Sequence, residues 1–130
     1  VDSCRERLGG STEFFVSDCT DLPFDGGAFD GIYAVHVTEH LDDEGMKMFA
    51  SECFRVLRPG GRMFVRSFSP GDMRAVPGNS VRNGISYRYR TPEDIGSGFP
   101  GFTRLHLGTV DEKTRFGTVR SRSECILEKP

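Results

Sequence analysis

Residues 54–65 read FRVLRPGGRMFV, which combines the end of a predicted helix, a break and the start of a predicted strand. The helix is predicted over 42–57, where apolar side chains recur at helical spacing behind a first turn rich in acids. Pro59 and the glycines after it cannot continue that helix. The apolar residues that follow predict a strand over 62–68.

Two further strands are predicted before this helix. Residues 29–37, FDGIYAVHV, form a nearly continuous apolar run, typical of a strand covered on both faces in a parallel sheet. Residues 12–18, TEFFVSD, are a shorter run of the same kind and predict another buried strand. The Pro- and Gly-containing segment 19–28 predicts a loop between them. Alternation of strand, helix and strand implies parallel pairing with a right-handed crossover.

The second half of the chain predicts a loop, a short helix and a closing hairpin. Residues 69–84 carry several Pro and Gly residues, and loops of this length often bind ligands or act as lids. TPEDI (91–95) predicts a helix start with Thr91 as cap and Pro92 in the first position. Residues 102–110 alternate cleanly, and with 118–129 they predict an antiparallel hairpin. We therefore predict one α/β domain over residues 1–130.

Composition excludes several classes of protein. The chain has 130 residues and a net charge of −2, so it lacks the overall excess of Lys and Arg that duplex nucleic acid requires. It has no apolar run of about 18 residues, so no interaction with a membrane is expected. Its four cysteines (Cys4, Cys19, Cys53 and Cys125) form no C-x-x-C pair. Reduced thiols, and hence a cytoplasmic location, are favoured over an extracellular disulfide framework.

Residues 36–40, HVTEH, match the His-x-x-Glu-His spacing of one class of zinc proteases. That chemistry needs the motif on a helix, where one turn brings both histidines to the same face. Here His36 lies at the end of a predicted strand, and the helix begins only near Asp42. The spacing therefore does not predict a protease.

Three stretches in this order carry a family resemblance: SDCTDLPFDGGAFDGIY (17–33), VTEHL (37–41) and FRVLRPGGRMFV (54–65). They resemble class I S-adenosylmethionine-dependent methyltransferases, especially the group that acts on small molecules. The resemblance covers most of residues 1–68. It implies a Rossmann-like, mostly parallel sheet that ends in an antiparallel hairpin. It also implies an S-adenosylmethionine cofactor and methyl transfer to an O, N or C nucleophile of a small-molecule acceptor.

The resemblance implies roles for the loop after the first predicted strand. The Asp18 carboxylate would accept a hydrogen bond from the adenine amino group, and the Cys19 backbone N–H would donate to an adenine ring nitrogen. Leu22 and Phe24 would pack beneath the ring. The residues alone leave another reading open, in which Asp18 caps its own turn.

The same resemblance implies that residues 36–40 face the methyl donor, with His36 beside the cofactor. His40 would act as a general base for a hydroxyl acceptor, or would only shape the pocket together with Glu39. Some relatives bind a divalent metal through Glu-x-x-Glu-His here; His36 replaces the first Glu, so a metal site stays an alternative. Residues 69–90 would form the lid, whose VRNGISYRYR run would face an anionic or aromatic acceptor or form a strand with exposed arginines.

One family feature has no counterpart in the sequence. No glycine-rich loop precedes residues 12–18, and Asp2, which could be the acid that binds the ribose, lies closer to Asp18 than usual. Without the strand before that loop, 12–18 and 29–37 have no shared partner. We expect a longer protein whose N-terminal segment is missing here, a partner strand from a homodimer or heterodimer, or direct pairing of the two strands. The alternative function is a non-catalytic module that pairs with another subunit.

Overall fold

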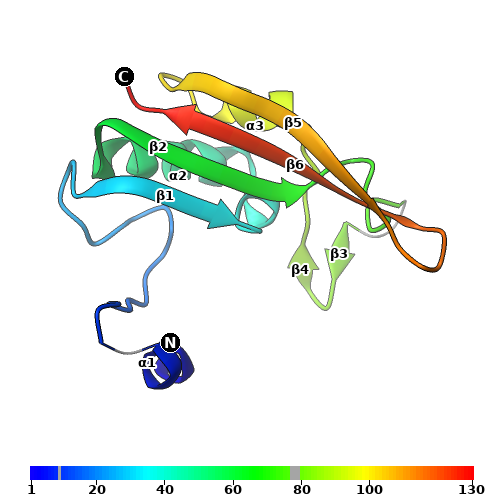
Figure 1. The fold of residues 1–130 in the computed structure, drawn as a ribbon, viewed down its shortest axis with the longest axis horizontal. Helices are drawn as coiled ribbons and strands as arrows, with labels where there is room; N and C mark the ends of the chain where they lie inside the picture. Colours follow the sequence, from blue (N-terminus) through cyan, green and yellow to red (C-terminus); the bar gives the residue numbers. More distant parts are fainter. Residues whose placement is uncertain (9, 77–79) are drawn as a thin grey trace.

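The computed structural model describes residues 1–8, 10–76 and 80–130. Four strands of these ranges form a mixed sheet in the order β1–β2–β6–β5 (Figure 1). The strands are β1 (Phe29–Val35), β2 (Leu57–Phe68), β5 (Thr103–Lys113) and β6 (Val119–Glu128). β1 is parallel to β2, whereas β6 is antiparallel to both β2 and β5. The α/β class, the parallel β1–β2 pair and the C-terminal hairpin are confirmed.

Both predicted helices are present, and the predicted Thr91 cap is confirmed. α2 (Asp43–Val56) begins after Asp42, whose carboxylate accepts the Gly45 N–H at 2.7 Å. α3 (Pro92–Gly98) begins with a capping box between Thr91 and Asp94. In the helix predicted over 42–57, all the apolar positions expected on its inner face are buried: Met46, Phe49, Ala50, Cys53, Val56 and Leu57.

The core lies on one face of the sheet. α2 and α3 pack there against inward side chains of β2 and β6 such as Met63, Val65 and Leu127. In Figure 1 both helices lie behind the sheet, and no described helix covers its front. Tyr33, which points to that front face, is 83% exposed, whereas Ala34 on the helix side is 2% exposed. The prediction that this strand is covered on both faces is therefore wrong.

The predicted buried strand over 12–18 is also wrong. These residues form no regular secondary structure, Val16 is 82% exposed, and the half-exposed Phe15 packs its ring edge-on against Phe24 at 5.0 Å. β1 has β2 as its one sheet partner, so direct pairing between the two segments does not occur either. Local strand propensity does not form a strand when no neighbour accepts its backbone hydrogen bonds. Before this segment lies α1 (Asp2–Leu8), which was not predicted and buries none of its residues.

Several boundaries and turns differ from the prediction. β2 begins at Leu57, so RPGG opens the strand, with Gly60 at φ +81°. β5 carries a bulge between Arg104 and His106, which breaks the predicted alternation. Within the predicted lid, β3 (Val81–Arg82) and β4 (Ile85–Ser86) form a small hairpin. Residues 77–79 of that loop lie outside the described residues. No helix in the described ranges has the length and apolarity to cross a bilayer.

Candidate functional site

The chain turns sharply at the carboxyl end of β1. His36 adopts a left-handed backbone conformation (φ 57°), while its N–H donates to the Arg66 carbonyl at 2.8 Å. A single 3-10 turn, η1 (Thr38–His40), follows before the cap of α2. HVTEH therefore lies on a turn, so the helical geometry that a zinc protease needs is absent.

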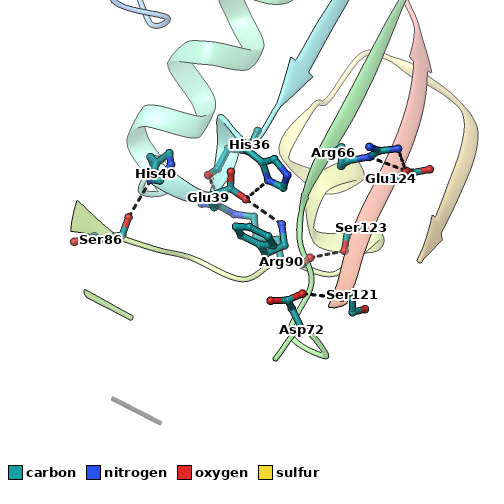
Figure 2. Close-up of polar contacts among 12 residues, drawn as sticks. His36, Glu39, His40, Arg66, Asp72, Ser86, Arg90, Ser121, Ser123 and Glu124 are labelled. Atoms are coloured by element: carbon teal, nitrogen blue, oxygen red, sulfur yellow. Dashed lines mark hydrogen bonds and ion pairs between the residues drawn. The ribbon is translucent and has the colours of Figure 1, made fainter. Parts of the chain in front are cut away.

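A buried carboxylate ties this turn to β2. Glu39 is 1% exposed, and its Oε2 accepts the Phe68 N–H at 3.0 Å and lies 3.3 Å from His36 Nδ1 (Figure 2). The His36 ring packs against the Phe68 ring at a centroid distance of 4.4 Å. Glu39 Oε1 has no hydrogen-bond partner among the described residues. The carboxylate thus fixes where the chain leaves β1 relative to where it leaves β2.

Arg90 holds the turn from its other side. Its guanidinium donates to the carbonyls of Thr38 and Leu41, the latter at 2.6 Å, and the residue is 9% exposed. Burial lowers the pKa of Arg90, with the nearby Arg88 as a second cause. The Ser123 hydroxyl donates to the Arg90 carbonyl at 2.7 Å, which connects this segment to β6. The expectation of exposed arginines in this run is therefore wrong for Arg90.

The first part of the predicted lid is anchored to the sheet. Asp72 is buried, and its carboxylate accepts the Ser121 N–H of β6 at 2.7 Å. The Ser69 hydroxyl donates to the Ser121 hydroxyl at 2.5 Å, and the Ser69 N–H donates to the Ser121 carbonyl. Residues 69–72 are consequently a fixed wall rather than a free flap.

A polar cavity of about 350 Å³ opens between the turn and the β3–β4 hairpin. It is lined by Glu39, His40, Leu41, Asp42, Ser86 and Arg88. His40 Nδ1 lies 3.4 Å from the Ser86 carbonyl, and the His40 ring meets Tyr87 edge-on at 4.9 Å. Because a carbonyl can only accept, this contact favours the tautomer with the proton on Nδ1. Nε2 then carries a lone pair that can accept a proton from a ligand.

The loop after residue 17 forms a capped turn. Asp18 is exposed, and its Oδ1 accepts both the Thr20 hydroxyl at 2.7 Å and the Thr20 N–H at 2.8 Å. These two bonds lower the pKa of Asp18 and keep it ionised, and the bond from the hydroxyl has the larger effect. The turn-capping geometry that the residues left open is therefore present. The contact with adenine stays a prediction.

Cys19 and Leu22 line a second, apolar cavity of about 280 Å³ between this loop, β1 and α2. Its walls include Ile32, Ala34 and Phe49. Desolvation in this setting raises the pKa of the Cys19 thiol, with the neighbouring Asp18 charge as a second cause. The surface is suited to a flat apolar group.

The predicted site residues do not gather around one cavity. Cys19 and Leu22 share the apolar cavity with Val37, whereas His40 opens to the polar one and His36 packs on Phe68. Asp2 lies in α1, which stands apart from the sheet, and bonds to Arg5 at 3.2 Å (Figure 1). Arg90 and Asp72 were not among the predicted site residues, because neither the YRYR run nor the Gly-rich loop distinguishes a buried charge from an exposed one.

The metal alternative receives no support from these residues. Within the described ranges, no group of three or more His, Cys, Asp and Glu side chains is arranged to hold a metal ion. His36 approaches Glu39, but His40 turns toward Ser86.

Known proteins resemble this chain in sequence and in fold. The family model described as a methyltransferase domain matches residues 1–65. The 2-methyl-6-phytyl-1,4-hydroquinone methyltransferase of Synechocystis sp. is 36% identical over 69 residues, which are 53% of this chain and 21% of that protein. The chain thus spans about a fifth of the length of this curated relative.

Solved structures agree on the fold. A SAM-dependent methyltransferase from Methanosarcina mazei superposes with a TM-score of 0.73 at 19% identity, over 93% of this chain and 68% of that one. The Burkholderia thailandensis 1,6-didemethyltoxoflavin-N1-methyltransferase, solved with bound 1,6-didemethyltoxoflavin and S-adenosylhomocysteine, superposes with a TM-score of 0.70 at 15% identity, over 98% of this chain and 55% of that one.

Proposed function

This chain belongs to the methyltransferase-domain family, and from that premise we propose that it serves methyl transfer from S-adenosylmethionine to an O, N or C nucleophile of a small molecule. The observation that carries the proposal is the family match over residues 1–65, which includes both the Asp18 turn and the His36–His40 turn. The hydroquinone methyltransferase among the relatives supports a small, hydroxyl-bearing acceptor.

The Asp18 turn has the groups needed to recognise a purine. Thr20 occupies only Oδ1, so Oδ2 keeps its capacity to accept a hydrogen bond from an exocyclic amino group. The two bonds from Thr20 hold the carboxylate in one orientation, so less conformational entropy is lost when a ligand binds. Leu22 and the apolar cavity beside it offer a surface for the ring. S-adenosylmethionine, when bound, supplies an activated methyl group on a sulfonium.

His40 is the group proposed to handle the acceptor's proton. Its Nδ1 faces the Ser86 carbonyl, which leaves Nε2 to take the proton of a hydroxyl as the new bond to carbon forms. Arg88 lines the same cavity and can neutralise an anionic acceptor. His36 is proposed to lie beside the cofactor, held by Glu39 and Phe68. The chain otherwise contributes by positioning, since the leaving group is a neutral thioether.

Calorimetric titration of the 130-residue chain with S-adenosylhomocysteine tests the proposal. We expect binding by the natural chain, loss of binding in Asp18→Ala, and unchanged binding in Asp21→Ala. Asp21 is another exposed acid in the same loop, so it is the matched control. Equal binding by Asp18→Ala and Asp21→Ala would show that Asp18 does not contribute to the cofactor site. No binding by the 130-residue chain together with binding by a version extended at the N-terminus would support a piece of a longer protein, whereas no binding by either would favour the second candidate function.

That second candidate is a non-catalytic module that pairs with another subunit. The observation favouring it is the outer edge of β1, which has no strand partner among the described residues. The cytoplasmic location stays a prediction; the four cysteines are free thiols, in keeping with it.

A further inference from the structure

A crevice lies between α2 and α3, which both cover the same face of the sheet (Figure 1). Its cavity of about 790 Å³ has the volume of a small-molecule site. A second cavity of about 390 Å³ adjoins it, because Lys47 and Pro100 line both. The described linings of the two cavities include none of Asp18, His36 and His40. The crevice is therefore separate from the two turns assigned to methyl transfer.

The spacing of side chains on α2 gives the crevice an apolar floor. Met46, Ala50 and Phe54 recur at intervals of four residues, so they lie along one face of the helix. The floor extends over about 12 Å, given the rise of 1.5 Å per helical residue. On the opposite wall, Gly98 approaches so closely that an added Cβ would lie 2.9 Å from Met46 Cε. A long, narrow apolar floor of this kind suits an unbranched alkyl chain.

The larger cavity carries an excess of positive charge. Its charged residues are three cations and two acids: Lys47, Arg88, Arg90, Asp43 and Asp94. Both acids already have partners, since Asp94 accepts the Thr91 N–H and Asp43 lies 3.8 Å from Arg88. Lys47 is exposed and forms no ion pair with any residue that the structure describes. Its ammonium group is therefore available to an anion.

The two basic residues next to α3 add to this positive field. Arg90 donates its guanidinium bonds to the carbonyls of Thr38 and Leu41, which leave its charge without a carboxylate partner. Burial lowers the pKa of Arg90, and the charge of Arg88 is the second cause. An anion close to Lys47 and Arg88 would reduce this repulsion and would gain charge-assisted hydrogen bonds.

Charge and apolar surface are separated along the crevice. Lys47 is the one charged residue among the described residues that line the smaller cavity, where Ala50, Phe54 and Pro100 supply apolar surface. Lysine packs its alkyl stem on apolar surface while its ammonium group stays in water. Lys47 therefore stands at the boundary between the charged cavity and the apolar one, and a matching ligand has one anionic end and one apolar end.

We propose that this crevice binds a small amphiphilic carboxylate, whose chain lies on the floor formed by Met46, Ala50 and Phe54 and whose head group pairs with Lys47. Arg88 is placed to be a second donor to the carboxylate. Because Arg88 also lines the polar cavity beside His40, the ligand would contact one wall of that cavity. The proposal requires neither methyl transfer nor S-adenosylmethionine.

Octanoate and octanol are matched probes, because they share a chain length and differ in charge. Methyl resonances of methionine locate their binding, since Met46 lines the crevice whereas Met48 and Met73 are exposed elsewhere. Titration with octanoate below its micelle concentration should shift the Met46 resonance to saturation. The resonances of Met48 and Met73 should stay in place. Met46→Leu identifies the responding signal.

Substitution of Lys47 tests the head-group contact. The natural chain should bind octanoate about twofold to fivefold more tightly than octanol, the range expected for an exposed ion pair. Lys47→Met keeps an apolar stem and should bind both probes equally, whereas Lys47→Arg should keep the preference. Lys113→Met, at an exposed position of β5, is the matched control and should also keep it.

Several results would overturn the proposal. A Met46 resonance that does not respond, or an equal response of Met48 and Met73, would show that octanoate has no site in the crevice. Equal affinity of the natural chain for octanoate and octanol would contradict the carboxylate contact. A preference that survives in Lys47→Met, or disappears in Lys113→Met, would contradict the role of Lys47. Circular dichroism and urea unfolding verify that each variant is folded.

Discussion

Glu39 is a buried carboxylate, and buried carboxylates normally have hydrogen-bond partners for both oxygens. It is almost completely buried, yet only one of its oxygens has a donor. The hydroxyls of Thr38 and Ser67 are equally buried and also lack partners among the described residues. Buried polar groups in this condition cost stability and are retained where they fix a specific arrangement. Here the arrangement is the turn that carries both histidines of HVTEH.

Glu39→Ala should lower the free energy of unfolding by about 1–3 kcal/mol, because the buried Phe68 N–H loses its acceptor. Glu39→Gln keeps an acceptor oxygen and should cost less. Urea unfolding followed by circular dichroism measures both. Glu13→Ala, at an exposed position, is the control and should leave the midpoint unchanged. An alanine variant as stable as the natural chain would show that the carboxylate is not part of the turn's support.

At the scale of elements, α3 is short and depends on its first turn. Thr91 Oγ1 accepts the Asp94 N–H, and the Asp94 carboxylate accepts the Thr91 N–H, both at 3.1 Å. Behind this cap, Ile95 is fully buried and Phe99, which follows the helix, is 1% exposed. The capped first turn of α3 therefore positions two core side chains, Ile95 and Phe99.

Thr91→Ala should destabilise the protein by about 1 kcal/mol, the usual cost of losing an N-cap side chain. Thermal unfolding in matched buffers would detect it. Thr12→Ala removes an exposed threonine from a segment without regular secondary structure and should shift the midpoint by much less. Equal shifts in the two variants would contradict a capping role.

The elements that the sequence predicts well are those whose signals are local. α2 and α3 have caps and a periodic face, so their position and their buried residues follow from spacing. Residues 12–18 have the composition of a strand, but strand formation depends on a neighbour that composition does not reveal. The β3–β4 hairpin had a local signal in the sequence, because Asn83–Gly84 forms a positive-φ turn, although this stretch was predicted as part of a loop.

The candidate site was less predictable than the fold, for a related reason. His40 and Asp18 could be named from motifs, but their separation into two cavities depends on the tertiary path of the loops. Arg90 lies in an alternating run that resembles an exposed strand. Its burial follows from carbonyls of Thr38 and Leu41, about fifty residues away in sequence. No local pattern encodes such a contact.

At the scale of the whole molecule, Arg90 connects three parts of the chain. It contacts the turn after β1 through its guanidinium, precedes α3 in sequence, and is bonded by Ser123 of β6 through its carbonyl. Removing this side chain should therefore loosen the site and the sheet together rather than one element.

Arg90→Met keeps the apolar stem and removes the donors, and it should cost about 2–4 kcal/mol because charged, buried hydrogen bonds are lost. Arg82→Met, in the exposed β3 strand, is the control. Hydrogen exchange followed by mass spectrometry should show faster exchange in residues 36–41 and 87–90 of the Arg90 variant only. Unchanged protection there would contradict the bridging role.

The placement of β6 has a consequence for how the protein is made. The last strand of the chain, ending at Glu128, lies inside the sheet between β2 and β5, and Lys129 then bonds to the carbonyls of Phe54 and Leu57. On the ribosome, β2 and β5 emerge before β6, so the strand edges that β6 later joins are still unpaired. The sheet can close only after residue 128 has cleared the exit tunnel, so until then the nascent chain exposes unpaired strand edges, which favour aggregation.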